Sequence, residues 1–228
     1  MDEFELIRRR FAPLATSPGA AGLTDDVAQI DLEGYGPGPG GTLIATMDAI
    51  VEGVHFLPED PIETVAAKLV RVNVSDILAK GGRPGPALLS LVWPRARDLR
   101  QVEQLALGLR KSLARWGATL IGGDTTAIDG PLVLSMTLLG RCGPNGPVRR
   151  ATARVGDEVW VTGAIGDGGL GLMAATEGLG PLTAEARSRL VSRYRTPEPP
   201  SLGFADVVAR HAGAAIDVEV ELGQCGVS

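Results

Sequence analysis

The chain is poor in the residues that build disulfide frameworks, zinc sites and nucleic-acid surfaces. Its 228 residues include only two cysteines and two histidines, and acidic residues outnumber basic ones by 27 to 22. Two cysteines far apart in the sequence argue against a disulfide framework or a zinc site. A net charge of −5 argues against a nucleic-acid or acidic-membrane partner, because both need a basic excess.

Other absences narrow the possible classes of protein. No Gly-Lys dipeptide occurs, which excludes a Walker-type phosphate loop, and no G-x-S-x-G or HExxH motif is present. No apolar run is long enough to cross a bilayer, and the N-terminus has no apolar signal-peptide core. We therefore expect a cytoplasmic protein with no membrane partner.

The composition is that of a folded protein, with 44% hydrophobic and 21% charged residues. A run rich in glycine and proline at 142–147 is the best candidate for a domain boundary. We predict an N-terminal domain at residues 1–145 and a partial C-terminal domain at 146–228.

Hydrophobic periodicity predicts a mixed α/β architecture. The expected helices are 3–11, 60–80, 98–116, 168–175, 184–194 and 201–211. The expected strands are 27–32, 42–48, 86–93, 120–121, 132–139, 157–162 and 214–218. Asp60, followed by Pro61 and Glu63, and Asp98 have the spacing of residues that cap helices.

Aspartates recur where apolar segments end, at Asp25-Asp26, Asp48, Asp76 and Asp124. Magnesium prefers oxygen ligands and commonly bridges carboxylates to substrate phosphates. If these side chains converge, they form a multi-metal nucleotide site. Individually, Asp25-Asp26 and Asp124 could equally lie in ordinary turns.

Asp76 gives the clearest single signal. It continues the apolar face that includes Val65, Leu69 and Val72. A carboxylate facing a core is costly unless it is paired, bound to metal or placed at a cleft. A functional role is favoured, and the alternative is a cap or a salt bridge to Arg71 or another arginine.

Of three further features, two have ordinary explanations. The segment from Gly166 to Gly171 matches G-x-G-x-x-G, which suggests a nicotinamide oxidoreductase, but the second strand with its acidic residue is missing. Glycines for tight strand–helix packing explain it better. Gly122-Gly123 would let backbone N–H groups approach a phosphate, and from its loop position alone His55 reads as a surface residue.

Several motifs together resemble the thiamine-monophosphate kinase family. They are Thr24-Asp25-Asp26-Val27-Ala28, Thr46-Met47-Asp48, Gly53-Val54-His55-Phe56, Val72-Asn73-Val74-Ser75-Asp76 and Gly122-Gly123-Asp124-Thr125. The resemblance extends over about residues 3–218. It places the chain in an ATP-binding superfamily with aminoimidazole-ribonucleotide synthetase, and implies homodimers whose N-terminal sheets pack together.

The resemblance implies ATP-dependent phosphorylation of thiamine monophosphate to thiamine diphosphate. By position it implies that ATP is bound by Gly122, Gly123 and Arg150 and the substrate by His55. The implied Mg²⁺ positions are Asp26, Thr46, Met47, Asp48, Asp76, Asp124 and Asp217. Met47 would act through its backbone carbonyl.

The resemblance ends after Val218, where the sequence continues Glu219-Val220-Glu221-Leu222. We expect a truncated or frameshifted second domain. Two alternatives to the kinase stay open, namely a catalytically silent Mg-nucleotide-binding remnant and a sister ATP-dependent enzyme that acts on another small molecule.

Overall fold

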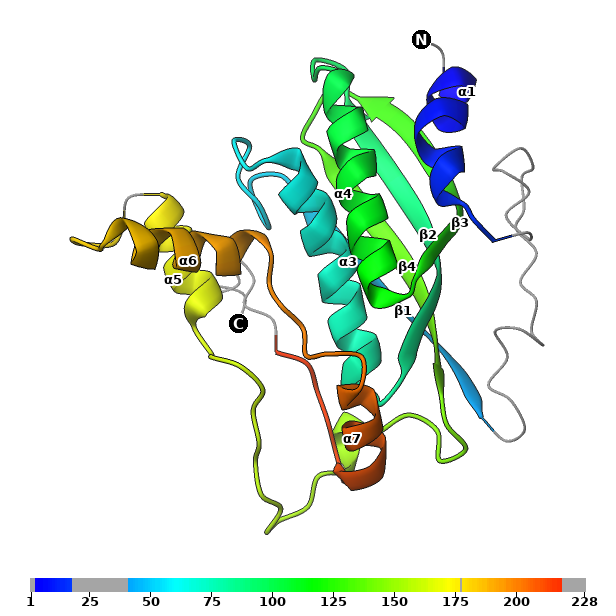
Figure 1. The fold of residues 1–228 in the computed structure, drawn as a ribbon, viewed down its shortest axis with the longest axis vertical. Coiled ribbons are helices and arrows are strands. Elements are labelled where there is room, and N and C mark those ends of the chain that lie inside the picture. The colour runs from blue at the N-terminus through cyan, green and yellow to red at the C-terminus, as the bar shows by residue number, and fades with distance from the viewer. Residues whose placement is uncertain (1–2, 18–40, 177, 219–228) are drawn as a thin grey trace.

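The computed structural model describes residues 3–17, 41–176 and 178–218 (Figure 1). The chain begins with α1 (Glu3–Leu6), which runs into a π-helical turn, η1 (Ile7–Phe11), and a 3-10 turn, η2 (Ala12–Leu14). The predicted helix at 3–11 is therefore confirmed, and its last residue, Phe11, is buried. The predicted strand at 27–32 and the neighbouring Asp25-Asp26 lie outside the described residues.

A mixed four-stranded sheet follows, as the α/β prediction requires. Its strands are β1 (Thr42–Val51), β2 (Arg83–Pro94), β3 (Thr119–Ile128) and β4 (Val133–Cys142), in the spatial order β1-β4-β2-β3. The central strand β4 is antiparallel to both of its neighbours, whereas β2 and β3 are parallel. Each strand is longer than the apolar run that predicted it, and β1 and β3 form the two edges.

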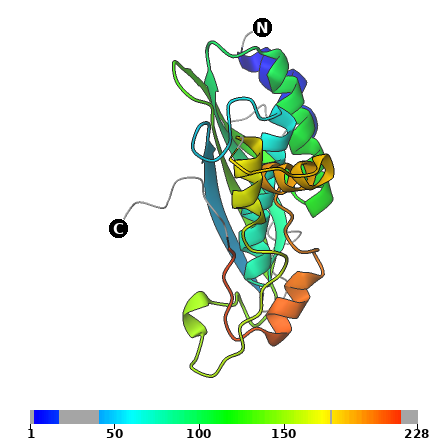
Figure 2. The same cartoon turned by 90° about the vertical axis from the view of Figure 1, so that its left-hand side faces the viewer.

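Two helices cover one face of this sheet, α3 (Ile62–Ala79) and α4 (Arg100–Trp116) (Figure 1). In Figure 2 the sheet is seen close to edge-on, and both helices lie on the same side of it. Leu69, Leu105 and Leu109 of the helices are fully buried, as are Leu134, Met136 and Leu138 of β4. Burying a side chain of this size contributes roughly 1.5–3 kcal/mol, so this contact forms the main core.

The opposite face of the sheet is uncovered by any described element. Along β1 every second side chain is exposed, including Leu43 at 41% and Met47 at 67%. On β2, Leu88 on the same face is 39% exposed. The protein thus carries a sheet face that is apolar and open, which we call the open face (Leu43, Met47, Leu88 and their neighbours).

The expected helix caps are only partly confirmed. α4 ends as predicted, because Gly117 takes a left-handed conformation with φ of 66°. The N-cap of α4 is Leu99 and not Asp98, although the Asp98 carboxylate accepts a hydrogen bond from the backbone N–H of Arg100 at 2.8 Å. The prediction that Asp60 caps α3 is wrong: the N-cap is Pro61, and no side chain caps this helix. The Asp60 carboxylate is instead bonded to residues of a distant helix.

After β4 the described chain forms a 3-10 turn, η4 (Arg150–Thr152), and the helices α5 (Asp167–Ala175), α6 (Ala184–Arg195) and α7 (Phe204–His211). The three predicted helices are confirmed, but the strands predicted at 157–162 and 214–218 do not form. A strand needs a neighbour for its backbone groups, and no described segment provides one. Val159 and Trp160 are accordingly 92% and 85% exposed.

Within the glycine-rich segment 166–171, which forms the N-cap and the first turn of α5, Gly171 is required by close packing. A Cβ added at Gly171 would lie 2.1 Å from the carbonyl oxygen of Leu190 on α6. The interpretation as packing glycines is therefore supported for Gly171 alone, and its partner is another helix and not a strand; a Cβ at Gly166 or Gly168 would meet nothing within 4 Å. None of the described helices is both long and apolar enough to span a membrane.

Candidate functional site

Thr46 and Asp76 meet where the covered side of β1 contacts α3. The Thr46 hydroxyl donates a hydrogen bond to Oδ2 of Asp76. Because strand side chains alternate, Asp48 lies on the same side of β1 as Thr46, whereas Met47 points to the open face. The structure therefore brings three of the predicted metal positions, Thr46, Asp48 and Asp76, to one side of the sheet.

A buried amide on α3 positions this part of the site. Asn73 is fully buried, and its Oδ1 accepts a hydrogen bond from the backbone N–H of Asp48 at 3.2 Å. Its Nδ2 donates to the carbonyl of Leu69 at 2.9 Å, so both ends of the amide are engaged. Sequence reasoning did not select Asn73. The signal was a polar residue about one turn before Asp76, on the buried face of the helix.

Asp217 joins this group from the other end of the chain. Lys80, just after α3, donates from Nζ to the carbonyl of Ala215 at 2.8 Å and so holds the segment that follows α7. Burial, and next the neighbouring Asp76 carboxylate, raise the pKa of Asp217. Two carboxylates this close repel one another when both are ionised. A cation placed between them would remove that repulsion, so the oxygen donors present fit a bound Mg²⁺.

Asp124 lies elsewhere. In the sheet register it stands beside Ser90 of β2, which in turn stands beside Ser135 of β4 and, beyond it, Ala49 of β1. Asp124 is therefore exposed on the open face, on the edge strand farthest from β1. Three strand spacings amount to roughly 14 Å. One subunit alone does not bring Asp124 to Asp76, and the described residues contain no cluster of three or more histidine, cysteine or acidic side chains that could hold a metal.

Gly122 and Gly123 are not in a turn. The expected Gly-Gly-Asp-Thr turn is wrong, because all four residues lie within β3. A Cβ at Gly123 would lie 1.9 Å from the carbonyl oxygen of Leu89, so close strand contact accounts for this glycine. Gly122 has room limited only by the side chain of Leu88. Arg150, the third predicted ATP position, is exposed in η4.

His55 is held firmly in the loop after β1. Its Nδ1 accepts a hydrogen bond from the backbone N–H of Val51 at 3.0 Å, and its carbonyl accepts one from Lys68 Nζ at 2.7 Å. A neutral imidazole that accepts at Nδ1 carries its proton on Nε2, which is then available to a ligand. The half-buried His55 is thus a fixed donor and not a freely moving surface side chain.

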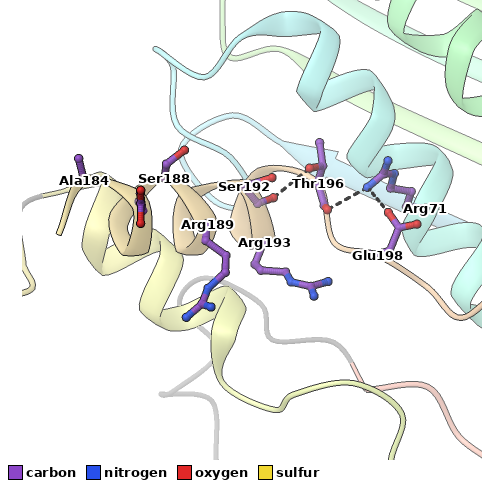
Figure 3. A pocket seen from close by; sticks show the side chains of 9 residues that line it. Arg71, Ala184, Ser188, Arg189, Ser192, Arg193, Thr196 and Glu198 are labelled. Atoms are coloured by element: carbon purple, nitrogen blue, oxygen red, sulfur yellow. Dashed lines mark hydrogen bonds and ion pairs between the residues drawn. The ribbon is translucent and has the colours of Figure 1, made fainter. Parts of the chain in front are cut away.

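A hollow in the described structure lies away from these aspartates. It has a volume of about 830 Å³ and lies between α6 and the segment that follows it (Figure 3). Arg71 on α3 borders it and is bonded to the carbonyl of Thr196 and to Glu198, as Figure 3 shows. One alternative for Asp76 was a salt bridge to Arg71. This salt bridge is not formed, because Arg71 pairs with Glu198 instead.

Comparison with known proteins defines the family. Residues 24–142, more than half of the chain, match the model for the N-terminal domain of AIR synthase related proteins. The chain belongs to the AIR synthase related family. The matched span contains all the predicted metal positions except Asp217.

Proteins similar to this chain include thiamine-monophosphate kinases. That of Caulobacter vibrioides is 40% identical over 217 residues, which cover 95% of this chain and 59% of the relative. The solved thiamine-monophosphate kinase of Stenotrophomonas maltophilia is 31% identical, with a TM-score of 0.70 over 84% of this chain and 59% of that one. AaThiL complexed with AMPPCP and TMP is 30% identical, with a TM-score of 0.71 over 77% of this chain and 55% of that one. The family member described here thus spans little more than half the length of these relatives.

Proposed function

We propose that this protein transfers a phosphoryl group from ATP to thiamine monophosphate, giving thiamine diphosphate, with Mg²⁺ as cofactor. The observation that carries the proposal is the meeting of oxygen donors from three distant segments, Thr46, Asp76 and Asp217. The relatives named thiamine-monophosphate kinase, and the AaThiL complex with AMPPCP and TMP, support the choice of substrates.

The chemistry explains why carboxylates without a strong base suffice. The acceptor is a phosphate monoester with a second pKa of about 6, so at neutral pH it is largely a dianion already. The main task is to bring two polyanions together in line. Mg²⁺ bound here would neutralise their charge. Asp76 and Asp217 would hold it. Further oxygen donors would come from β1, namely the side chains of Thr46 and Asp48 and the backbone carbonyl of Met47.

Beside this group, we propose that His55 binds the substrate through Nε2–H. Because Nδ1 is occupied as an acceptor, Nε2–H is the donor that the ring has left for a ligand. A phosphate oxygen or a ring nitrogen of the substrate would suit such a donor. Gly122, Gly123 and Arg150 stay predictions as ATP positions, and so does Asp26 as a metal ligand.

We further propose that two copies pair through the open face. An exposed apolar patch that includes Leu43, Met47 and Leu88 is typical of a protein–protein contact. Pairing of two such sheets places the edge strand β3 of one copy near the edge strand β1 of the other. Asp124 would then lie against the open side of the partner's β1, and we propose that it reaches the partner's site around this edge strand, since within one chain it lies far from Asp76.

The first experiment tests the activity itself. Purified protein is incubated with ATP, Mg²⁺ and thiamine monophosphate, and thiamine diphosphate is measured by chromatography. Asp76→Ala should lower the rate by more than about a hundredfold, because it removes charge stabilisation at the transferring group. Asp129→Ala, an exposed aspartate after β3, is the matched control and should leave the rate unchanged. A folded protein that binds Mg-ATP without turnover would refute the kinase and favour the binding remnant.

The second experiment tests the shared site. Asp76→Ala and Asp124→Ala are each expected to be inactive, and the two are then mixed and allowed to exchange subunits. If Asp124 acts in the partner's site, every mixed dimer regains one complete site, and activity returns to about a quarter of the wild-type value. Mixtures that stay inactive although heterodimers form would place both residues in one subunit's site.

The cytoplasm is our proposed location for this activity, since ATP and Mg²⁺ are available there. The absence of nucleic-acid and membrane partners stays a prediction from the net charge of −5.

A further inference from the structure

Two tethers fix the loop that carries His55. The first is Lys68 on α3, whose Nζ donates to the His55 carbonyl at 2.7 Å. The second acts two residues beyond His55, where the backbone N–H of Leu57 donates to Oδ2 of Asp60 and to the hydroxyl of Tyr194, both at 3.0 Å. The intervening Phe56 is 2% exposed, so the loop is anchored in the core between the two tethers.

One side chain from the C-terminal part of the chain touches both tethers. The ring of Tyr194, on α6, lies under Lys68, with Nζ 4.1 Å from the ring centroid. Its hydroxyl donates to Asp60 at 2.7 Å while accepting from Leu57. Burial, and next the bond to Asp60, raise the pKa of Tyr194, so the hydroxyl stays protonated and keeps donating at physiological pH.

The position of Tyr194 is itself well determined. The next residue, Arg195, donates from Nε to Oδ1 of Asp60 at 2.7 Å. Arg71 donates to the carbonyls of Thr196 and Pro197 at 2.9 and 3.1 Å and pairs with Glu198 (Figure 3). Residues 194–198, at the end of α6 and just after it, are therefore each bonded to the part of the chain around α3 and the His55 loop.

We propose that Tyr194 is a positioning residue for His55: its ring fixes Lys68, its hydroxyl fixes Leu57 and Asp60, and the two contacts together set the imidazole for substrate. This inference rests on the proposed role of His55 in binding thiamine monophosphate. Tyr194 itself need not touch the substrate, because its contacts run through the loop backbone and the lysine.

The test combines kinetics with a spectroscopic measurement. Tyr194→Phe removes the hydroxyl and keeps the ring, whereas Lys68→Met removes the bond to the His55 carbonyl. Each variant should raise KM for thiamine monophosphate by about tenfold and change kcat by less than about twofold, since a hydrogen bond within a charged network is lost. Lys111→Met is the matched control. This lysine, on the neighbouring helix α4, pairs with Glu63 at 3.2 Å on the surface, and KM should stay at the wild-type value.

The spectroscopic measurement needs no activity. The chain has two histidines, and His211 on α7 provides an internal reference. Imidazole ¹⁵N spectra of the wild type should show His55 as the Nε2–H tautomer. Tyr194→Phe and Lys68→Met should both shift the His55 signals and mix the tautomers, and leave those of His211 in place.

The outcomes separate this inference from the proposed function. His55 signals unchanged in both folded variants would overturn the inference, even if the enzyme is active. Shifted His55 signals in a protein without kinase activity would support the positioning role and refute the proposed reaction. If Tyr194→Phe does not fold, Lys68→Met decides, because it leaves the contacts at Asp60 intact.

Discussion

Asp60→Ala should destabilise the protein far more than the loss of a helix cap would. The Asp60 side chain is 2% exposed and accepts hydrogen bonds from Leu57 N–H, the Tyr194 hydroxyl and Arg195 Nε. Removing one partner of a buried ion pair costs about 3–5 kcal/mol. The Arg195 side chain is 29% exposed and regains water, so we expect the lower end, about 3 kcal/mol. A lost cap would cost about 1 kcal/mol.

Urea unfolding followed by tryptophan fluorescence measures this difference. Trp93 and Trp116 are buried in the main core, so their emission reports the unfolding of that core. Asp98→Ala is the control, because Asp98 is an exposed aspartate at the start of the neighbouring helix, and it should shift the midpoint much less. If Asp60→Ala lowers the free energy of unfolding by no more than Asp98→Ala does, the bonds of Asp60 to Leu57, Tyr194 and Arg195 do not stabilise the fold.

Three further predictions address the site and the sheet. The pKa of Asp217 is raised in the folded state, so ionisation of this carboxyl destabilises the fold. The stability that the neutral carboxyl contributes is complete below the unfolded pKa of about 3.9 and is lost as pH rises through the folded pKa. Without Mg²⁺, Asp217→Asn should therefore raise the free energy of unfolding at pH 7 and leave it unchanged near pH 3, and an equal effect at both would contradict this. Gly123→Ala should destabilise by about 1–3 kcal/mol in urea titration, because its Cβ would collide with a backbone carbonyl, whereas Gly143→Ala, with nothing within 4 Å, should not. Asn73→Ala should cost about 1–3 kcal/mol and weaken Mg²⁺ binding measured by calorimetry, because the backbone N–H of Asp48 loses its acceptor; unchanged Mg²⁺ affinity would show that Asn73 does not position the site.

The sequence predicted some strands correctly and another wrongly, and the difference has a physical reason. The strands expected at 86–93 and 132–139 form, because β2 and β4 lie beside other strands and their apolar faces are covered. The strand expected at 157–162 has similar residues and does not form. A local pattern can state that a segment suits a strand, but the pairing partner lies elsewhere in the chain.

The candidate site shows the same division. The motifs around Thr46, Asp76 and Asp217 selected residues that do meet, and the motif around Asp124 selected one that lies on the other face of the sheet. The register of the strands decides the face on which Asp124 lies, and strand order decides its distance, since β1 and β3 stand at opposite edges. Spacing along the sequence carries no information about strand order.

The sequence by itself determined the elements whose signals are local: the apolar spacing of α3 and α4, the left-handed glycine that ends α4, and the motifs that mark the family. Tertiary structure alone decided the partners of Asp60, the contacts of Tyr194 and the side of the sheet on which Asp48 and Asp124 lie. A helix or strand periodicity depends on residues a few positions apart. A buried carboxylate binds the strongest donors that the fold brings to it, and here those donors stand more than a hundred residues away.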